Sequence, residues 1–266
     1  MKKQILTLFI ASIMIVSIGV ISAVTDCTFT NIGTTMTLDA DCTTDATISV
    51  TDGFTLDGNG YTITAVDPSG GHFLGAVIKN AGATAYVTNL GVATNGLANV
   101  CDGGDNRLRG IMFEGASGSI TNSVVNDINQ GLSGCQEGNA IEVRNAPFDG
   151  THPGTVTVEV SHNTINNYQK TGVVANGDVD VNVNHNTITG LGPVNYIAQN
   201  GIQLGFFSKG EVTDNVVSGN YYTGEFWSSA GLLFYSVYPK EITKRHNILD
   251  GNQAGQLTAN ANAAWI

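Results

Sequence analysis

A short pattern of hydrophobic and polar positions recurs along the middle of the chain about every thirty residues. Each copy opens with a small residue and continues apolar, variable, apolar, variable, the period-two pattern of a β-strand with one buried face. The copies open at Gly110, Ala140, Gly172, Gly201 and Gly231, so the successive steps are 30, 32, 29 and 30 residues. A repeat of this length is typical of a solenoid, in which each rung of strands packs on the next.

Two inward-facing columns of side chains follow when the copies are superposed. The first column is Ile111, Ile141, Val173, Ile202 and Leu232. The second is Phe113, Val143, Ala175, Leu204 and Phe234. We expect both columns to lie in the core, because a stack of half-buried strands shares one continuous apolar interior.

A second strand in each copy ends in an asparagine. The series is Asn122, Asn163, Asn186, Asn215 and Asn247. Stacked asparagine side chains can hydrogen-bond from rung to rung at a turn, and the alternative is that these residues only favour the turn itself. In four copies the preceding residue is polar as well, namely His162, His185, Asp214 and His246. We expect these four to lie in solvated turns, with metal binding as the less favoured alternative.

These repeats, with the stretch FTLDGNGYTIT from Phe54 to Thr64, resemble the right-handed parallel β-helix proteins of the pectate-lyase-like superfamily. The resemblance covers Leu38 to Ala254 and implies an all-β, right-handed parallel β-helix. We expect one such domain over residues 24–266, with an N-terminal cap at about 24–47. Proteins of this superfamily include polysaccharide lyases, glycosidases, epimerases, tailspikes, adhesins and proteins of no known activity. The fold therefore does not name the activity.

The first 23 residues predict export. Lys2 and Lys3 precede an apolar run, and Ile21-Ser22-Ala23 precedes a polar sequence, as in a secretory signal cleaved after Ala23. The apolar run is also long enough for an uncleaved membrane anchor, which is the alternative. Either way we expect a secreted protein or one at the extracellular surface, with membrane contact only through this segment.

Charge and composition narrow the class of partner. The chain has 11 Lys and Arg against 22 Asp and Glu, a net charge of −11, which argues against nucleic acid and anionic membrane surfaces. Only 12% of residues are charged and Gly numbers 33, as expected for a solenoid whose exterior carries mainly hydroxyl and amide groups. The expected partner is a polysaccharide or a cell-surface glycan.

Four cysteines in an exported chain suggest two disulfides. Pairing Cys27 with Cys42 and Cys101 with Cys135 keeps both closed loops short among the three possible arrangements. The first bond would hold the N-terminal cap, and the second would close a longer loop. The alternative is four reduced thiols.

The outward positions of the first strand define a candidate site. One predicted outward column is Lys79, Glu114, Arg144, Asn176, Gly205 and Tyr235. Its neighbour is Val77, Met112, Glu142, Val174, Gln203 and Leu233. Two irregular stretches interrupt the repeats nearby, residues 94–108 with Asp102, Asp105 and Arg107, and residues 145–155 with Asp149 and His152. Such insertions emerge from one side of a solenoid, often the binding side.

Two chemistries fit this cluster. Glu114 and Glu142 could act as the acid and base of an inverting glycoside hydrolase. Alternatively, Arg144, Arg109 or His152 could be the base of a polysaccharide lyase, although an arginine loses its proton only in a specially arranged site. In that case Asp102, Asp105 and Glu142 could hold calcium, the one cofactor that the sequence suggests. The paired-arginine and Asp-His signatures of the familiar pectate lyases are absent, so no catalytic residue is transferred from them.

The predicted catalytic residues are therefore Glu114, Glu142 and Arg144, with Asp102 and Asp105 as metal ligands. The predicted substrate-binding residues are Arg107, Arg109, Asp149, His152, Asn176, Gln203 and Tyr235. The alternatives are metal binding without catalysis, or a salt-bridged ladder of Lys79, Glu114 and Arg144 with no chemistry.

Aromatic residues gather after residue 165 and could stack on sugar rings in a groove, or simply pack over the last coils. They include Tyr168, Tyr196, Phe206, Phe207, Tyr221, Tyr222, Phe226, Trp227, Tyr235 and Tyr238. We expect an exported β-helix protein that binds or processes an extracellular polysaccharide, by hydrolase or lyase chemistry if it is an enzyme. The alternative is a non-catalytic surface, adhesive or structural protein.

Overall fold

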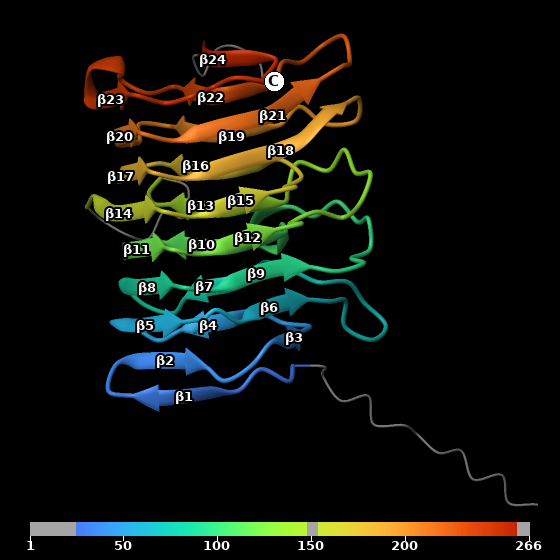
Figure 1. The fold of residues 1–266 in the computed structure, drawn as a ribbon, viewed down its shortest axis with the longest axis vertical. Coiled ribbons are helices and arrows are strands. Elements are labelled where there is room, and N and C mark those ends of the chain that lie inside the picture. The colour runs from blue at the N-terminus through green and yellow to red at the C-terminus, as the bar shows by residue number, and fades with distance from the viewer. Residues whose placement is uncertain (1–24, 148–153, 260–266) are drawn as a thin grey trace, which may run out of the picture.

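The protein is a stack of parallel β-strands wound into three long sheets (Figure 1), as a computed structural model shows for residues 25–147 and 154–259. Among the described residues there are 24 strands, two short 3-10 turns at Gly104–Asn106 and Pro239–Glu241, and no α-helix. This confirms the all-β prediction and fits a parallel β-helix. The predicted signal or anchor at 1–23 lies outside the described residues.

Sheet C, which contains the first strand of each repeat, has eight strands. They are β4 (Ile48–Val50), β7 (Ala76–Asn80), β10 (Arg109–Glu114), β13 (Asn139–Arg144), β16 (Thr171–Asn176), β19 (Asn200–Gly205), β22 (Ala230–Tyr235) and β24 (Ala254–Ala259). The last strand, β24, pairs in parallel with β22. The backbone ladder of sheet C thus continues past residue 251, although the sequence pattern of the repeat is weaker there.

Sheets A and B contain the other two strands of each rung. Sheet A consists of β1 (Phe29–Ile32), β2 (Thr35–Leu38), β5 (Phe54–Asp57), β8 (Thr84–Thr88), β11 (Ser117–Thr121), β14 (Val156–Ser161), β17 (Val179–Asn184), β20 (Lys209–Thr213) and β23 (Ile242–Arg245). Sheet B consists of β3 (Cys42–Thr44), β6 (Thr62–Ala65), β9 (Gly91–Thr94), β12 (Val124–Asn126), β15 (Thr164–Asn166), β18 (Thr187–Val194) and β21 (Val216–Tyr222).

The two predicted inward columns are confirmed. Ile111, Ile141, Val173, Ile202 and Leu232 are Cα partners on successive strands of sheet C, as are the five residues of the column that begins at Phe113. All ten side chains are buried in one hydrophobic core. The core therefore runs along the whole stack, enclosed by the three sheets.

The small residue that opens each repeat is required by the close approach of neighbouring rungs. A Cβ atom at Gly172 would lie 2.6 Å from the carbonyl oxygen of Gly201, and one at Gly201 would lie 2.7 Å from that of Gly231. Real Cβ atoms do not approach oxygens so closely, although Ala140 is accommodated at the equivalent position. This contact explains why the repeat begins with the same residue type in most rungs.

A buried asparagine ladder joins the rungs at the turn from sheet A to sheet B. The Oδ1 of Asn186 accepts hydrogen bonds from the backbone N–H and the side-chain amide of Asn163, at 2.9 and 3.0 Å. Asn215 does the same for Asn186, and Asn247 for Asn215. The predicted ladder is therefore confirmed for Asn163, Asn186, Asn215 and Asn247.

The prediction was wrong for Asn122, which lies one residue before the ladder position. Ser123 occupies that position instead, and its backbone N–H donates to Asn163 Oδ1 at 3.0 Å. Asn122 has a φ of 50° and is the counterpart of His162, whose φ is 57°. The error arose because asparagine is favoured at both positions, in one for its side-chain amide and in the other for its tolerance of positive φ.

The disulfides agree with the prediction, and the N-terminal end of the stack has a strand pairing of its own. Strand β1 pairs antiparallel with β2 at the N-terminal end, and β1–β2 is the one antiparallel pair among the described residues. Both predicted disulfides form, Cys27–Cys42 and Cys101–Cys135, each with Cα atoms 5.0 Å apart. Two disulfides suggest an oxidising environment. No helix in the described part of the chain is long and apolar enough to cross a membrane.

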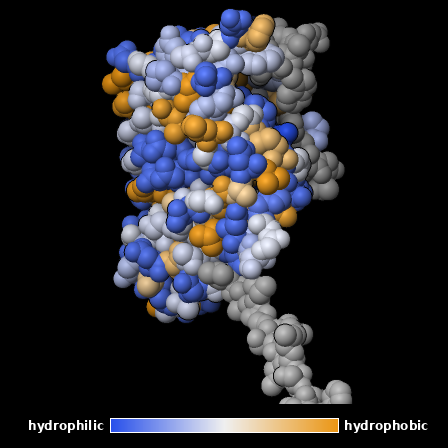
Figure 2. Space-filling view, turned by 90° about the vertical axis from the view of Figure 1, so that its right-hand side faces the viewer, coloured by the Kyte–Doolittle hydropathy of each residue, from blue (hydrophilic) through white to orange (hydrophobic). Residues whose placement is uncertain are grey.

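The side of the stack that carries the loops from sheet B to sheet C is shown in Figure 2. Hydrophobic residues there form small separate groups among hydrophilic ones, and no single apolar patch covers this side. A surface of this kind suits contact with water and polar partners.

Replacing Asn186 by alanine is expected to lower the free energy of unfolding by about 2 to 4 kcal/mol, because buried groups of three rungs lose their partners together. Urea denaturation followed by circular dichroism measures this change. The matched control is Asn182→Ala on the preceding strand β17, where the side chain is exposed and the expected change is below about 0.5 kcal/mol. Equal losses in both variants would contradict the structural role of the ladder.

Candidate functional site

The predicted site lies on the outward face of sheet C, where β7, β10 and β13 run side by side. Glu114 is the Cα partner of Arg144, and Met112 is the partner of Glu142, as predicted. Lys79, however, pairs with Met112 and not with Glu114. The predicted register of β7 was therefore shifted by two residues, because the chain before β10 has no clear copy of the repeat.

Glu114 is held by two cations. Lys79 reaches diagonally across the sheet to place its Nζ 2.6 Å from Glu114 Oε2. The Nε–H of Arg144 donates to Glu114 Oε1 at 2.9 Å. The Nη2 of Arg144 pairs with both Glu114 and Asp105. The predicted charge ladder thus exists, and it extends to the loop that contains Asp105.

A second ion pair lies beside the first. The Nε of Arg109 donates to Glu142 Oε2 at 2.7 Å, and Asn139 donates its amide to the same oxygen at 2.8 Å. The remaining nitrogens of Arg109 donate to the carbonyl oxygens of residues 104, 105 and 107, at 3.2, 3.4 and 2.8 Å. Arg109 therefore fastens the loop of residues 95–108 to the face of sheet C.

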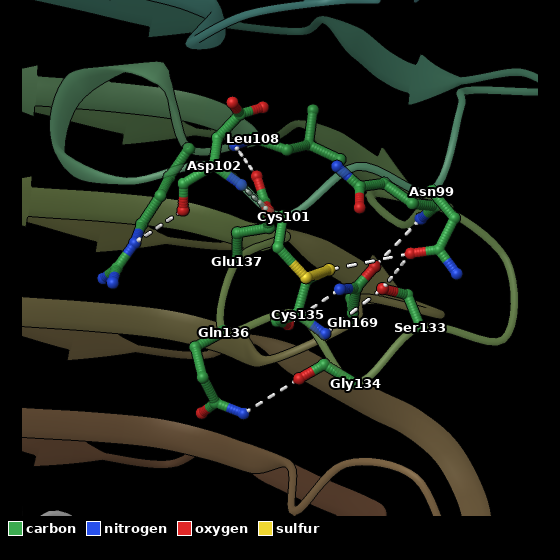
Figure 3. The surroundings of a disulfide bond; sticks show 12 residues. Asn99, Cys101, Asp102, Leu108, Ser133, Gly134, Cys135, Gln136, Glu137 and Gln169 are labelled. Carbon is green, nitrogen blue, oxygen red and sulfur yellow. Dashed lines mark hydrogen bonds between the residues drawn. A yellow bond between two sulfur atoms is a disulfide. The ribbon is translucent and has the colours of Figure 1, made fainter.

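A disulfide and a buried carboxylate also fasten this loop (Figure 3). Cys101 is bonded to Cys135, and the carboxylate of Glu137 accepts the backbone N–H groups of Asp102 and Leu108 at 2.9 and 2.7 Å. Nearby, Ser133 donates its hydroxyl to Asn99 Oδ1 at 2.6 Å. The loop is thus a fixed cover over this part of the sheet.

The electrostatics of the cluster favour charged and paired groups. Burial alone would lower the pKa of Arg144, but its hydrogen bonds to Asp105 and Glu114 outweigh that effect and hold the pKa above its ordinary value. The hydrogen bond from Arg144 in turn holds the pKa of Asp105 below its ordinary value. An arginine held in its protonated form is poorly suited to be a general base.

Of the two predicted catalytic carboxylates, Glu114 borders a hollow on this face and Glu142 does not. A shallow hollow of about 260 Å³ is lined by Lys79, Glu114 and residues 80–83, and Glu142 does not border it. Glu142 is 5% exposed and Arg109 is 3% exposed. Three carboxylates (Asp105, Glu114 and Glu142) balance three cations (Lys79, Arg109 and Arg144). Catalysis by Glu114, Glu142 and Arg144 stays a prediction.

The predicted calcium ligands have other partners. Asp102 lies 2.8 Å from His72 Nε2, and Asp105 pairs with Arg144. In the described ranges, the one cluster of three potential metal-ligating side chains consists of Asp26, Cys27 and Cys42, and both of its sulfurs belong to a disulfide. Calcium binding by Asp102, Asp105 and Glu142 likewise stays a prediction.

The predicted substrate-binding residues divide into three groups. Arg107 lies in the loop of residues 95–108, and Arg109 is the first residue of β10 and binds this loop. Asn176 and Tyr235 flank Gly205 in one outward column of sheet C, and Gln203 lies in the neighbouring column. Asp149 and His152 lie outside the described residues.

A second surface, next to Tyr235, carries paired aromatic rings. The ring centroids of Phe206 and Tyr235 are 5.0 Å apart in an edge-to-face arrangement, and those of Phe207 and Tyr238 are 5.7 Å apart. Phe207 is 53% exposed and Tyr238 is 58% exposed. These four residues are here called the aromatic turn. Tyr235 ends β22, and the other three follow β19 or β22 where the chain leaves sheet C.

The backbone of the aromatic turn is unusual for such residues. Phe206 and Phe207 have φ values of 54° and 74°. The same turn position is occupied by Gly115 and Gly177 in earlier rungs, with φ values of 58° and 86°. A left-handed conformation costs a residue with a side chain about 1 to 2 kcal/mol, so two successive phenylalanines are held here against their backbone preference.

Sequence reasoning missed two side chains that hold the loop of residues 95–108 in place. Glu137 accepts two backbone N–H groups of this loop, and His72 pairs with Asp102. Both lie outside the regular repeats, so no periodicity indicated their neighbours. The one indication in the sequence was that Glu137 lies two residues after Cys135, and this spacing alone does not predict its partners.

Comparison of the chain with protein-family models, with curated proteins and with solved structures finds no match. The function is therefore argued from the geometry of these surfaces.

Replacing Arg109 by methionine is expected to lower the free energy of unfolding by about 3 to 5 kcal/mol, because Glu142 would stay buried without its cation. Urea denaturation gives the energy, and faster hydrogen exchange in residues 95–108 would report opening of the loop. The double variant Arg109→Met/Glu142→Met is expected to recover much of the loss. The control Arg107→Met, at an exposed residue, should change little. Similar losses in both single arginine variants would contradict the fastening role of Arg109.

Acid is expected to loosen the loop through Asp105. The pKa of this carboxyl is lowered in the folded protein, so its pairing with Arg144 stabilises the fold above the ordinary aspartate pKa of about 3.9. That contribution is lost as the pH falls through the lowered pKa. Hydrogen exchange of residues 95–108 at decreasing pH, corrected for the intrinsic rate, should show this transition in the wild type and lack it in Asp105→Asn. A transition that persists unchanged in the variant would exclude Asp105 as its origin.

Proposed function

We propose that this protein is an exported β-helix protein that binds an extracellular polysaccharide or cell-surface glycan, with the aromatic turn as its binding surface. The observation that carries this proposal is the exposure of Phe207 and Tyr238 as neighbouring rings on successive rungs. Sugar rings present C–H faces that pack on aromatic rings, while their hydroxyl groups stay hydrogen-bonded to water and polar side chains.

The conformational cost of the aromatic turn supports a binding role. Strained positions persist where the surrounding structure holds them, and they concentrate at functional sites. Here the backbone N–H groups of Phe206 and Phe207 donate to the carbonyl oxygens of Tyr235 and Ser236, each at 2.9 Å. The next rung therefore fixes the turn, and the rings need little further ordering when a ligand binds.

Binding is preferred over hydrolysis or lyase chemistry because of the state of the ionic cluster. Its carboxylates are paired with cations, its arginines donate to fixed acceptors, and the loop of residues 95–108 covers it. An acid and a base that act on a glycan must reach the bond to be cleaved. The cluster instead has the contacts of a structural fastening.

We also infer that the protein belongs to the pectate-lyase-like superfamily and is secreted or held at the extracellular surface. The thirty-residue repeat and the three stacked parallel sheets support the first inference. The sequence of residues 1–23 and the two disulfides support the second.

The test is binding of the purified protein to a panel of neutral and acidic polysaccharides by affinity electrophoresis, with calorimetry on soluble fragments of any that bind. Phe207→Ala and Tyr238→Ala are each expected to weaken binding about tenfold, which corresponds to about 1.4 kcal/mol. Tyr238→Phe should retain most of the affinity, because the stacking face is kept.

The matched control is Phe226→Ala, which removes an aromatic ring that is 79% exposed and lies outside the aromatic turn. Its binding should equal that of the wild type. Equal losses in Phe226→Ala and Phe207→Ala would mean that exposed rings act non-specifically. Absence of binding to every polysaccharide of the panel would overturn the proposal.

A further inference from the structure

Four residues with metal-ligating side chains stand in one column at the turn from sheet A to sheet B. Each follows the last residue of a sheet A strand, and each rung hydrogen-bonds to the next there. The N–H of His162 donates to Asn184 O at 3.2 Å, and that of His185 to Thr213 O at 3.3 Å. The column is His162, His185, Asp214 and His246, and all four residues are exposed.

The backbone requirement at this turn does not by itself call for histidine. All four residues have φ between 54° and 57°, a left-handed conformation that asparagine, aspartate and histidine tolerate best. Earlier rungs meet the same requirement with Asn89 and Asn122, whose φ values are 54° and 50°. After β14 the column contains three histidines and an aspartate in place of asparagine. These side chains can bind a metal ion, and the backbone conformation of the turn stays the same.

The two histidines on adjacent rungs are close and oriented. The ring centroids of His162 and His185 are 5.0 Å apart, with the planes inclined by 19°. The Nδ1 of His185 lies 2.8 Å from Asn184 Oδ1, and when this nitrogen donates to the amide oxygen, Nε2 is left as an acceptor. Metal-bound histidines are commonly held in this way by a partner on the other ring nitrogen.

We propose that His162 and His185 form a binding site for a divalent transition-metal ion of the Cu²⁺, Ni²⁺ and Zn²⁺ class. Bonds of about 2.0 to 2.1 Å require two ligand nitrogens within about 4 Å of each other, and rotation of the two exposed rings brings neighbouring rungs into that range. Imidazole suits these ions, whereas calcium and magnesium prefer oxygen ligands.

Asp214 lies one rung beyond His185 and is not among the proposed ligands. Its Oδ1 lies 3.3 Å from His246 Nδ1, so the carboxylate faces the next rung and not His185. The net charge of −11 favours accumulation of cations at the surface. This site is separate from the aromatic turn and from the ionic cluster, and it does not rest on the proposed glycan binding.

The experiment uses Cu²⁺ as the probe, because it binds imidazole sites most tightly among these ions. The complete chain, without an affinity tag, is titrated by calorimetry in the presence of a weak competing chelator. Electron paramagnetic resonance then reports the nitrogen ligands. We expect one ion per chain with two imidazole nitrogens. His162→Asn and His185→Asn should each weaken binding at least tenfold and remove one nitrogen from the spectrum.

These asparagine variants keep the left-handed turn, as Asn89 and Asn122 show, so loss of binding is not caused by misfolding. Asp214→Asn should change the affinity little and retain both nitrogens, because the Asp214 carboxylate faces His246. The control His72→Asn, at a histidine that pairs with Asp102 and lies outside this column, should bind as the wild type. Unchanged affinity in His162→Asn and His185→Asn would overturn the proposal, as would half an ion per chain with a doubling of the mass in light scattering.

Discussion

Hydrogen bonding between rungs at a fixed register is the constraint on which the rest of the structure depends. Each strand of the three sheets pairs with the strands one rung away, so every residue stacks on residues in the same environment. One position must be apolar in every rung, another must be small, and a third must be a polar group with a donor and an acceptor. Asn163, Asn186 and Asn215 satisfy the last requirement, because one amide serves the rungs on both sides.

The same register explains why the charged cluster is stable although it is largely covered. Residues one rung apart on sheet C bring Glu114 to Arg144, and the long side chains of Lys79 and Arg109 reach across the register to the remaining carboxylates. Removing charged groups from water is costly unless each finds a partner and further hydrogen bonds. Carbonyl oxygens of the loop complete the shell of Arg109, so the loop and the cluster stabilise each other.

Features that follow from the regular repeat could be predicted from the sequence. Features outside the repeat could not. The core columns from Ile111 to Leu232 and both disulfides were predictable, because periodicity and loop length constrain them directly. The position of Lys79 was not, since β7 precedes the regular repeats. Asn122 was misplaced by one residue because two adjacent positions favour the same residue type for different reasons.

For the candidate site, too, the sequence predicted some contacts and missed others. Glu114, Glu142 and Arg144 lie on adjacent strands as expected. The fastening of the loop over them depends on Glu137 and on backbone carbonyl oxygens, which no sequence pattern reveals. A cluster of carboxylates and arginines in a sequence is compatible with catalysis and with fastening. In a fastening role each charged group is paired with another group of the folded chain, whereas a catalytic group is free to reach a substrate. Only the three-dimensional structure shows which is the case.

The turns offer more freedom for function than the sheets do. Inside the sheets a residue must match its neighbours above and below, whereas a left-handed turn position requires only a tolerable φ. Glycine occupies one such position at Gly177, and Phe206 takes its place one rung later. Asn122 gives way to His162 and His185 in the same manner. The backbone hydrogen bonds between rungs are preserved in both cases. A new side chain can therefore appear at the same turn position of successive rungs without disturbing the core. The spacing of the rungs then sets the distance between these side chains.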